Sequence, residues 1–266
     1  MIACTMAQSL KIARGFKNFF EEIGDMANFA GRFFREVFTR PFEFKELLRQ
    51  CYVIGNRSLF LVAVTGFILG LVFTLQSRPT LIKFGAVSWM PSMIVLSIVR
   101  EIGPVVIALI CAGKIGSGIG AELGSMRVTE QIDAMEVSGT NPFKYLVVSR
   151  ILATTLMLPL LVLFGDAIAI TGSALVENLK GEVSYQLYFI QAFDALEFSD
   201  IIPATIKTFF FGFAIGLVGS FKGYYCKKGT AGVGEASNSA VIYASMLLFV
   251  LDFIAVFITD IFYGTS

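Results

Sequence analysis

Arg100 and Glu101 stand side by side within an apolar stretch, residues 86–112, that is long enough to cross a membrane. Each ionised side chain near a bilayer centre costs roughly 2.5–3.5 kcal/mol on insertion scales, so such residues face a bundle interior or a water-filled cavity. Neighbours on a helix point about 100° apart, so the two need not pair with each other. The doublet predicts a polar site on a substrate pathway, with a structural ion pair as the alternative.

Asp166 and Asp252 lie in two other apolar stretches and are candidate partners for Arg100. Two aspartates inside membrane helices also suggest an intramembrane aspartyl protease. That interpretation is disfavoured because its Gly-x-Gly-Asp motif needs glycine where this chain has Leu163, and a tyrosine where it has Leu251.

Other kinds of chemistry are excluded by what the sequence lacks. None of the 266 residues is histidine, which excludes Ser-His and Cys-His catalysis and histidine-ligated metals. The four cysteines form no Cys-x-x-Cys pair, and the net charge of +1 argues against nucleic acid as a partner. The glycine-rich run at 229–234 lacks the Gly-Lys-Ser/Thr ending of a phosphate loop. We expect no catalytic residue, no metal and no cofactor in this chain.

The elements that position these residues follow from composition. Hydrophobic residues make up 56% of the chain and charged residues 15%, whereas a soluble domain carries about a quarter charged residues. The apolar surplus must therefore face lipid. We expect an all-α membrane protein with about five transmembrane helices, at residues 58–76, 86–112, 146–176, 201–221 and 240–262.

The N-terminal residues 1–57 form a separate part that we place on the cytoplasmic side, before a membrane domain at residues 58–266. Residues 12–38 combine an aromatic face with a charged one, which is typical of a helix lying in the membrane interface. The alternative is that the aromatic side chains pack on the protein's own spans. Pro41 ends this helix, and residues 42–54 predict a second, shorter amphipathic helix.

Two further amphipathic segments connect spans. Residues 126–138, between spans two and three, predict a short cytoplasmic helix that ends at Gly139 and docks a soluble partner through its apolar stripe. The alternative is an interfacial helix without a partner. Residues 177–200, between spans three and four, carry five acids and predict a short amphipathic helix at the outer membrane surface.

Lysine and arginine positions predict the orientation. The N-terminal 57 residues carry nine, the segment between spans two and three carries four, and that between spans four and five carries three. The opposite side carries only four, namely Arg78, Lys83, Lys180 and Lys207. By the positive-inside rule the N-terminus is cytoplasmic, and five crossings place the C-terminus outside.

Three runs resemble the signature block of the MlaE (YrbE) permeases: Arg100-Glu-Ile-Gly-Pro-Val-Val, Ala112-Gly-Lys-Ile-Gly-Ser-Gly and Ala121-Glu-Leu-Gly-Ser-Met-Arg-Val-Thr-Glu-Gln-Ile-Asp-Ala-Met-Glu. The similarity covers about residues 65–260. It implies the inner-membrane subunit of an ABC transporter that moves phospholipids between inner and outer membranes. The family permease is a homodimer with a cytoplasmic ATPase that binds the ATP, a periplasmic ring of MCE-domain subunits, and often a STAS-domain protein.

The resemblance also implies roles for single residues. Arg100 and Glu101 would lie in or near the lipid cavity at the dimer interface. The residues that would line its outer mouth are Gln76, Leu81 and Phe84. The helix that would couple to the ATPase carries Glu130, Gln131, Ile132, Asp133, Met135 and Glu136. Arg78-Pro79 and Phe84 depart from the family pattern, which leaves the lipid preference open.

A rival interpretation is a secondary transporter driven by an ion gradient without an ATPase. Such transporters are commonly built from internal repeats, and the five expected spans show no evident repeat. The ABC permease interpretation is therefore preferred.

Overall fold

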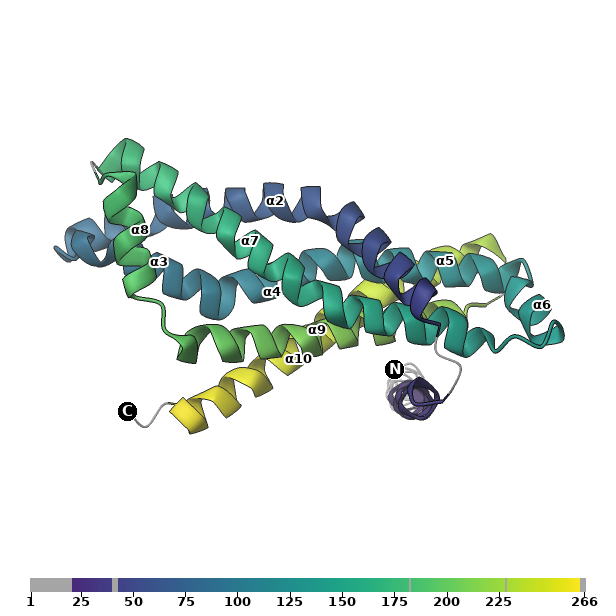
Figure 1. Ribbon diagram of the computed structural model, residues 1–266. Helices are drawn as coiled ribbons and strands as arrows, with labels where there is room; N and C mark the ends of the chain where they lie inside the picture. The colour runs from purple at the N-terminus through teal and green to yellow at the C-terminus, as the bar shows by residue number, and fades with distance from the viewer. Residues whose placement is uncertain (1–20, 40–42, 182, 228, 264–266) are drawn as a thin grey trace, which may run out of the picture.

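The computed structural model describes residues 21–39, 43–181, 183–227 and 229–263, and its regular structure there is helical. Five helical segments in this part are long and apolar enough to cross a membrane, as expected. The first is α2 (Phe44–Lys83), the fourth α9 (Phe198–Tyr224) and the fifth α10 (Thr230–Tyr263). The short helices α6 (Gln131–Val137) and α8 (Tyr185–Asp194) connect spans at opposite ends of the bundle (Figure 1).

The second and third spans contain π turns. The second comprises η1 (Val87–Trp89), α3 (Met90–Ser97), η2 (Ile98–Ile102), α4 (Gly103–Cys111), η3 (Ala112–Gly116) and α5 (Ser117–Val128), of which η2 and η3 are π turns. The third comprises the π turn η4 (Phe143–Val148) followed by α7 (Ser149–Gly181). Each π turn inserts one residue into the helical repeat and so changes which face the following side chains occupy.

The expectation of a separate amphipathic helix at residues 42–54 is wrong. From Phe44 onward these residues belong to α2, which continues to Lys83, so the expected boundary after residue 57 falls inside one helix. The polar residues of this segment interrupt the apolar pattern but do not break a helix, because only proline and glycine strongly oppose helix propagation.

The helices α2 and α9 each pack closely on α7 because small residues at the contacts let the helix backbones approach one another. A Cβ added to Gly70 of α2 would lie 1.9 Å from the carbonyl oxygen of Ala169 in α7. A Cβ added to Gly216 of α9 would lie 2.1 Å from Thr154 Oγ1 on another part of α7. Small residues allow this approach in lipid, where hydrophobicity does not drive helix association. The third span is therefore the centre of the bundle, with α2 and α9 on either side of it (Figure 1).

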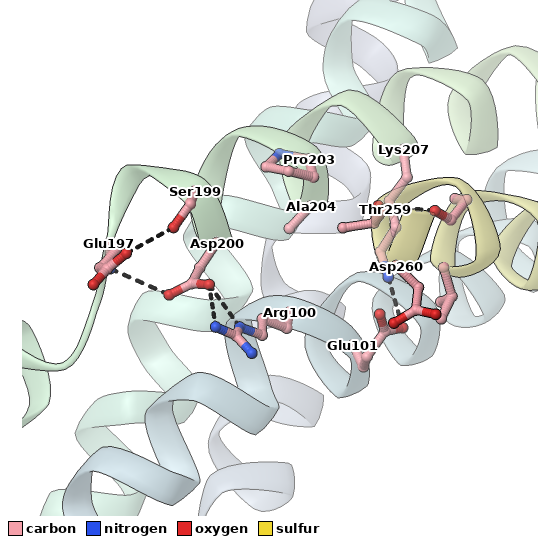
Figure 2. Close-up of a pocket in the computed structure, with 12 residues that line it drawn as sticks. Arg100, Glu101, Glu197, Ser199, Asp200, Pro203, Ala204, Lys207, Thr259 and Asp260 are labelled. Atoms are coloured by element: carbon pink, nitrogen blue, oxygen red, sulfur yellow. Dashed lines mark hydrogen bonds and ion pairs between the residues drawn. The ribbon is translucent and has the colours of Figure 1, made fainter. Parts of the chain in front are cut away.

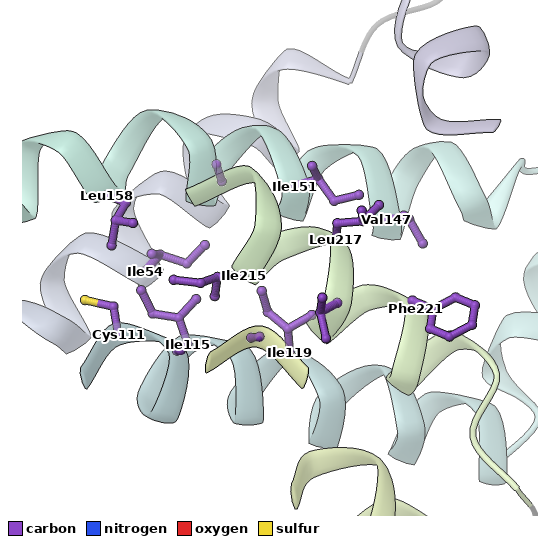
Figure 3. Close-up of a cluster of buried hydrophobic side chains, with 14 of the residues drawn as sticks. Ile54, Cys111, Ile115, Ile119, Val147, Ile151, Leu158, Ile215, Leu217 and Phe221 are labelled. Atoms are coloured by element: carbon purple, nitrogen blue, oxygen red, sulfur yellow. The ribbon is translucent and has the colours of Figure 1, made fainter. Parts of the chain in front are cut away.

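The buried apolar core lies where the second, third and fourth spans meet. Figure 3 shows Cys111 and Ile115 of the second span, Ile151 and Leu158 of the third, and Ile215 of α9 converging there. In the most apolar stretch of the third span 67% of residues are buried, but only 11% in α10. The most apolar stretch of the last helix is therefore little buried within one chain.

The helix formed by residues 21–37 packs on the ends of the spans. Phe29 and Phe33 are 2% and 3% exposed, and the Phe29 ring lies 5.0 Å from Phe143 of η4 and 5.5 Å from Phe221 of α9. Phe34 remains 54% exposed. Some aromatic side chains of this helix thus pack on the protein's own spans, and others are exposed, as in a helix that lies in the membrane interface. Residues 12–20 of the expected helix lie outside the described residues.

Candidate functional site

Arg100 and Glu101 are presented by the π turn η2. Its closing hydrogen bond runs from the Gly103 N–H to the Ile98 carbonyl, five residues back. Pro104 follows and contributes no N–H, so the ordinary helical hydrogen-bond pattern cannot be restored at once. Turns of this kind recur at functional sites because they redirect side chains without ending the helix. The two neighbouring charges accordingly reach different partners.

Arg100 pairs with Asp200 in the first turn of α9. Its Nε donates to Asp200 Oδ1 at 2.7 Å, and its NH2 group contacts the same oxygen. The Asp200 side chain is 5% exposed and also closes a capping box with Glu197 at the start of α9. The expectation that Arg100 pairs with Asp166 or Asp252 is wrong, because Asp200, assigned to the outer surface segment, is buried beside it.

Glu101 pairs with Lys207, which lies two helical turns after Asp200 on α9. Lys207 Nζ donates to Glu101 Oε2 at 2.7 Å and to Asp252 Oδ1 of α10 at 3.1 Å. Sequence reasoning assigned Lys207 to the outer segments and missed its role. The signal was available, since Asp200 and Lys207 are seven residues apart and therefore share one helix face.

These charges line a cavity of about 480 Å³ between η2, the start of α9 and the end of α10 (Figure 2). Its charged lining residues are Arg100, Glu101, Glu197, Asp200, Lys207 and Asp260. The Arg100 and Glu101 side chains are 56% and 47% exposed, whereas Lys207 is almost fully buried. The cavity thus has a buried ionic floor and accessible charged groups above it.

An apolar groove of about 620 Å³ adjoins this cavity along α9 and α10. The two share Pro203, Lys207, Ala255 and Thr259. The remaining groove residues are Ile202, Ile206, Phe210, Phe211, Leu251, Ile254, Ile258 and Phe262. A charged cavity that opens onto an apolar groove can accommodate an amphipathic molecule, with its polar end and its hydrocarbon chains on adjacent surfaces.

Asp166 lies behind the site and does not line the charged cavity. Its residue is 5% exposed, and Oδ1 has no hydrogen-bond partner among the described residues. The carboxyl group contacts Gly103, directly after η2, and borders a void of about 10 Å³ beside Thr208. Asp252 lines neither space and pairs with Lys207. The two aspartates therefore do not line either of these spaces together.

The structure does not bring Gln76, Leu81 and Phe84 to the charged cavity. Gln76 is exposed on α2, and Phe84 is 80% exposed just after it. Leu81 is 9% exposed and belongs to a buried cluster with Met90 and Ile94. Their role at an outer mouth stays a prediction.

The expectation that the helix after the second span presents its apolar stripe to a partner is wrong. Ile132 is fully buried and Met135 packs beside it on the core, so the apolar stripe faces the protein. Glu130 adopts a left-handed conformation (φ 59°) that separates α5 from α6 and divides the expected helix 126–138. The exposed residues are Glu130, Gln131, Asp133, Ala134, Glu136 and Val137. The surface available to a partner is thus mostly polar, with Ala134 and Val137 as its exposed apolar residues.

A second ion pair joins α2 to α7. Arg78 NH1 donates to Glu177 Oε1 at 2.8 Å, and the two side chains are 16% and 0% exposed. Glu177 was expected on the outer surface and instead is buried, with Oε2 unpaired among the described residues. Neither residue lines the charged cavity or the apolar groove. This pair is therefore suited to holding two helices together.

Metal chemistry has no ready site in the described part of the chain, where no three acidic or cysteine side chains gather to hold an ion. The cysteines described there, Cys51, Cys111 and Cys226, are free thiols.

Comparison with known proteins identifies relatives of this chain. The family model for Permease MlaE matches residues 47–258. A probable ABC transporter permease protein of Rickettsia felis is 38% identical over 92% of this chain and 93% of that protein. The intermembrane phospholipid transport system permease protein MlaE of Haemophilus influenzae is 34% identical over 84% and 85%, respectively. A probable ABC transporter permease protein of Synechocystis is 30% identical over the same shares.

Proposed function

Because this chain belongs to the MlaE permease family, we propose that it is the membrane subunit of an ATP-driven transporter that moves phospholipids between the inner and outer membranes. The observation that carries this proposal is the charged cavity opening onto the apolar groove between α9 and α10. The cavity receives the headgroup and the groove receives the acyl chains.

Arg100 is the phosphate-binding group in this proposal. A guanidinium group offers five N–H donors, and Asp200 engages only part of them, so the exposed remainder can reach a phosphate oxygen. Lys207 holds Glu101 and Asp252 in place from below. The phospholipid thus meets a cation and acids that are already positioned before it binds.

The exposed apolar surface of α10 supports a homodimer as the working unit. The α10 residues Leu251, Ile254, Ile258 and Phe262 line the apolar groove, and only 11% of the most apolar stretch of this helix is buried within one chain. In a homodimer two such surfaces enclose a shared space, so that neither groove faces bulk lipid along its whole length.

Energy comes from a separate cytoplasmic ATPase that docks on α6, since the chain has no phosphate loop of its own. The protein is a multi-pass inner membrane protein with a cytoplasmic N-terminus and a periplasmic C-terminus. An MCE-domain ring sits at the α8 end and a STAS-domain protein binds the ATPase. The charge bias of the connecting segments and the family relationship support these assignments.

The test is ATP-driven transfer of labelled phospholipid by the reconstituted transporter carrying Lys207→Met, with Lys180→Met as the matched control. Met fills the volume of the lysine stem but releases Glu101 and Asp252. Lys180 is exposed on α7 and lines neither space. Loss of one charge-assisted contact costs about 1.5–3 kcal/mol, so we expect transfer to fall at least about tenfold for Lys207→Met alone. Equal transfer by both variants would contradict the proposal.

A further inference from the structure

On the premise that the cavity receives a phospholipid headgroup, we propose that it selects headgroups carrying a primary ammonium group, such as ethanolamine, over anionic headgroups without an amine. The inference concerns which phospholipid this chain prefers. It rests on the charge balance of the cavity, on which of its charges are already paired, and on the side-chain types present.

The cavity is acidic. Its described lining residues include two cations, Arg100 and Lys207, against four carboxylates, those of Glu101, Glu197, Asp200 and Asp260. Asp252, which does not line the cavity, adds another negative charge beside Lys207. A headgroup that brings only a phosphate charge enters a space with excess negative charge, whereas an added ammonium group offsets it.

Both cations are engaged before any lipid enters. Lys207 is 5% exposed and contacts two carboxylates, so it has little access to a ligand. Arg100 contacts Asp200 and keeps part of its guanidinium group accessible. The cavity therefore offers one site for a single phosphate, at Arg100, and no second free cation for a headgroup with more negative charge.

The accessible acids lie where an amine could reach them. Glu101 is 47% exposed although it pairs with Lys207, and Asp260 is exposed with no hydrogen bond or ion pair to another described residue. Figure 2 shows both carboxylates on the side of the cavity away from Glu197. Carboxylate oxygens accept charge-assisted hydrogen bonds, and a primary ammonium group has three N–H donors to give.

Side-chain types favour a primary over a quaternary amine. Quaternary ammonium groups have no N–H and are usually recognised by the faces of aromatic rings. Among the described residues that line the charged cavity none is aromatic, and the aromatic side chains of this region lie in the apolar groove. An ethanolamine headgroup therefore fits the cavity better than a choline headgroup.

The experiment measures which lipid the full chain retains. Purified protein is equilibrated with mixed micelles holding equal amounts of phosphatidylethanolamine, phosphatidylcholine and phosphatidylglycerol, and the retained lipids are quantified by mass spectrometry. We expect phosphatidylethanolamine to exceed phosphatidylglycerol about tenfold, the ratio that 1.4 kcal/mol of differential binding gives. Phosphatidylcholine should be retained less than phosphatidylethanolamine.

Two variants test whether the headgroup preference arises in the cavity. Asp260→Asn removes an exposed carboxylate without breaking an ion pair, and it should lower the preference for phosphatidylethanolamine about threefold, as expected for one exposed charge contact. Asp194→Asn, an exposed acid at the end of α8 that does not line the cavity, should leave the preference unchanged. Retention of the three lipids in equal amounts, or an equal effect of both variants, would overturn the inference while leaving the proposed lipid site standing. If no phospholipid is retained at all, the proposed function fails and the inference falls with it.

Discussion

Two of the ion pairs that connect spans in the described part of the chain, Arg78–Glu177 and Lys207–Glu101, differ in what surrounds them. Arg78 and Glu177 join α2 to α7 in a sealed contact, with 16% and 0% of the side chains exposed. Lys207 is just as buried, but its partner Glu101 is 47% exposed and lines a cavity of about 480 Å³. A sealed pair can only hold helices together, whereas an open one has carboxylate and guanidinium groups left for a ligand. Under the proposed function, access to the charges is what distinguishes the Lys207–Glu101 site from the Arg78–Glu177 pair.

The largest effect expected from this comparison is that of Arg78→Met. It leaves Glu177 buried without a counter-charge, and breaking a buried pair from one side costs about 3–5 kcal/mol. Thermal unfolding of the purified protein in detergent should show a large loss of stability. The double variant Arg78→Met with Glu177→Leu should regain most of it, because replacing both partners by apolar residues is nearly neutral.

Thermal unfolding of the Lys207→Met variant tests the Lys207–Glu101 site in the same way. Its stability loss should be smaller than that of Arg78→Met, because the released carboxylates of Glu101 and Asp252 are 47% and 19% exposed, whereas Glu177 is fully buried. Equal losses of stability for the two variants would mean that both ion pairs are structural.

A smaller effect is expected for Gly103→Ala, which asks whether the open site depends on the buried contact behind it. The new Cβ would lie 1.8 Å from Asp166 Oδ1 and 2.8 Å from the Ile98 carbonyl oxygen, so η2 or α7 must shift. Overpacking of this kind costs about 1–3 kcal/mol. We expect both lower thermal stability and slower lipid transfer, because Arg100 and Glu101 move with the turn.

Gly113→Ala is the matched control, since no atom outside its own turn lies within 4 Å of the added Cβ. Alanine in a helix is favoured over glycine by about 0.5–1 kcal/mol, so this variant should be as stable as the original or slightly more so. Wild-type stability and transfer in Gly103→Ala would show that the contact with Asp166 does not support the site.

The smallest expected effect concerns α6, where buried and exposed apolar side chains occur on one helix. Val137 is 90% exposed, and Val137→Ala should weaken binding of the partner ATPase about fivefold, because roughly 1 kcal/mol of apolar contact is removed. Titration of labelled ATPase measures this. Ile132→Val, in the buried position, should instead lower stability by about 0.5–1.5 kcal/mol and leave the affinity unchanged. Weaker ATPase binding by Ile132→Val and not by Val137→Ala would mean that α6 rotates when the partner docks.

Apolar composition and charge placement were enough to predict five spans, the helix after the second span and the helix between the third and fourth, and all are present. The partners of the close helix contacts at Gly70 and Gly216 could not be assigned from the sequence, because a glycine does not indicate which helix approaches it. The apolar side chains of α6 were assigned to a docking surface, since an amphipathic pattern is the same whether its stripe faces a partner or the core.

That Arg100 and Glu101 need polar surroundings inside a span follows from the sequence alone, because lipid cannot solvate an ionised group. The residues that supply these surroundings are known only from the fold. Asp200 lies 100 positions from Arg100 along the chain, and Lys207 lies 106 from Glu101. Pairing over such separations depends on how far each helix is rotated, and a single π turn changes that rotation by enough to exchange one partner for another.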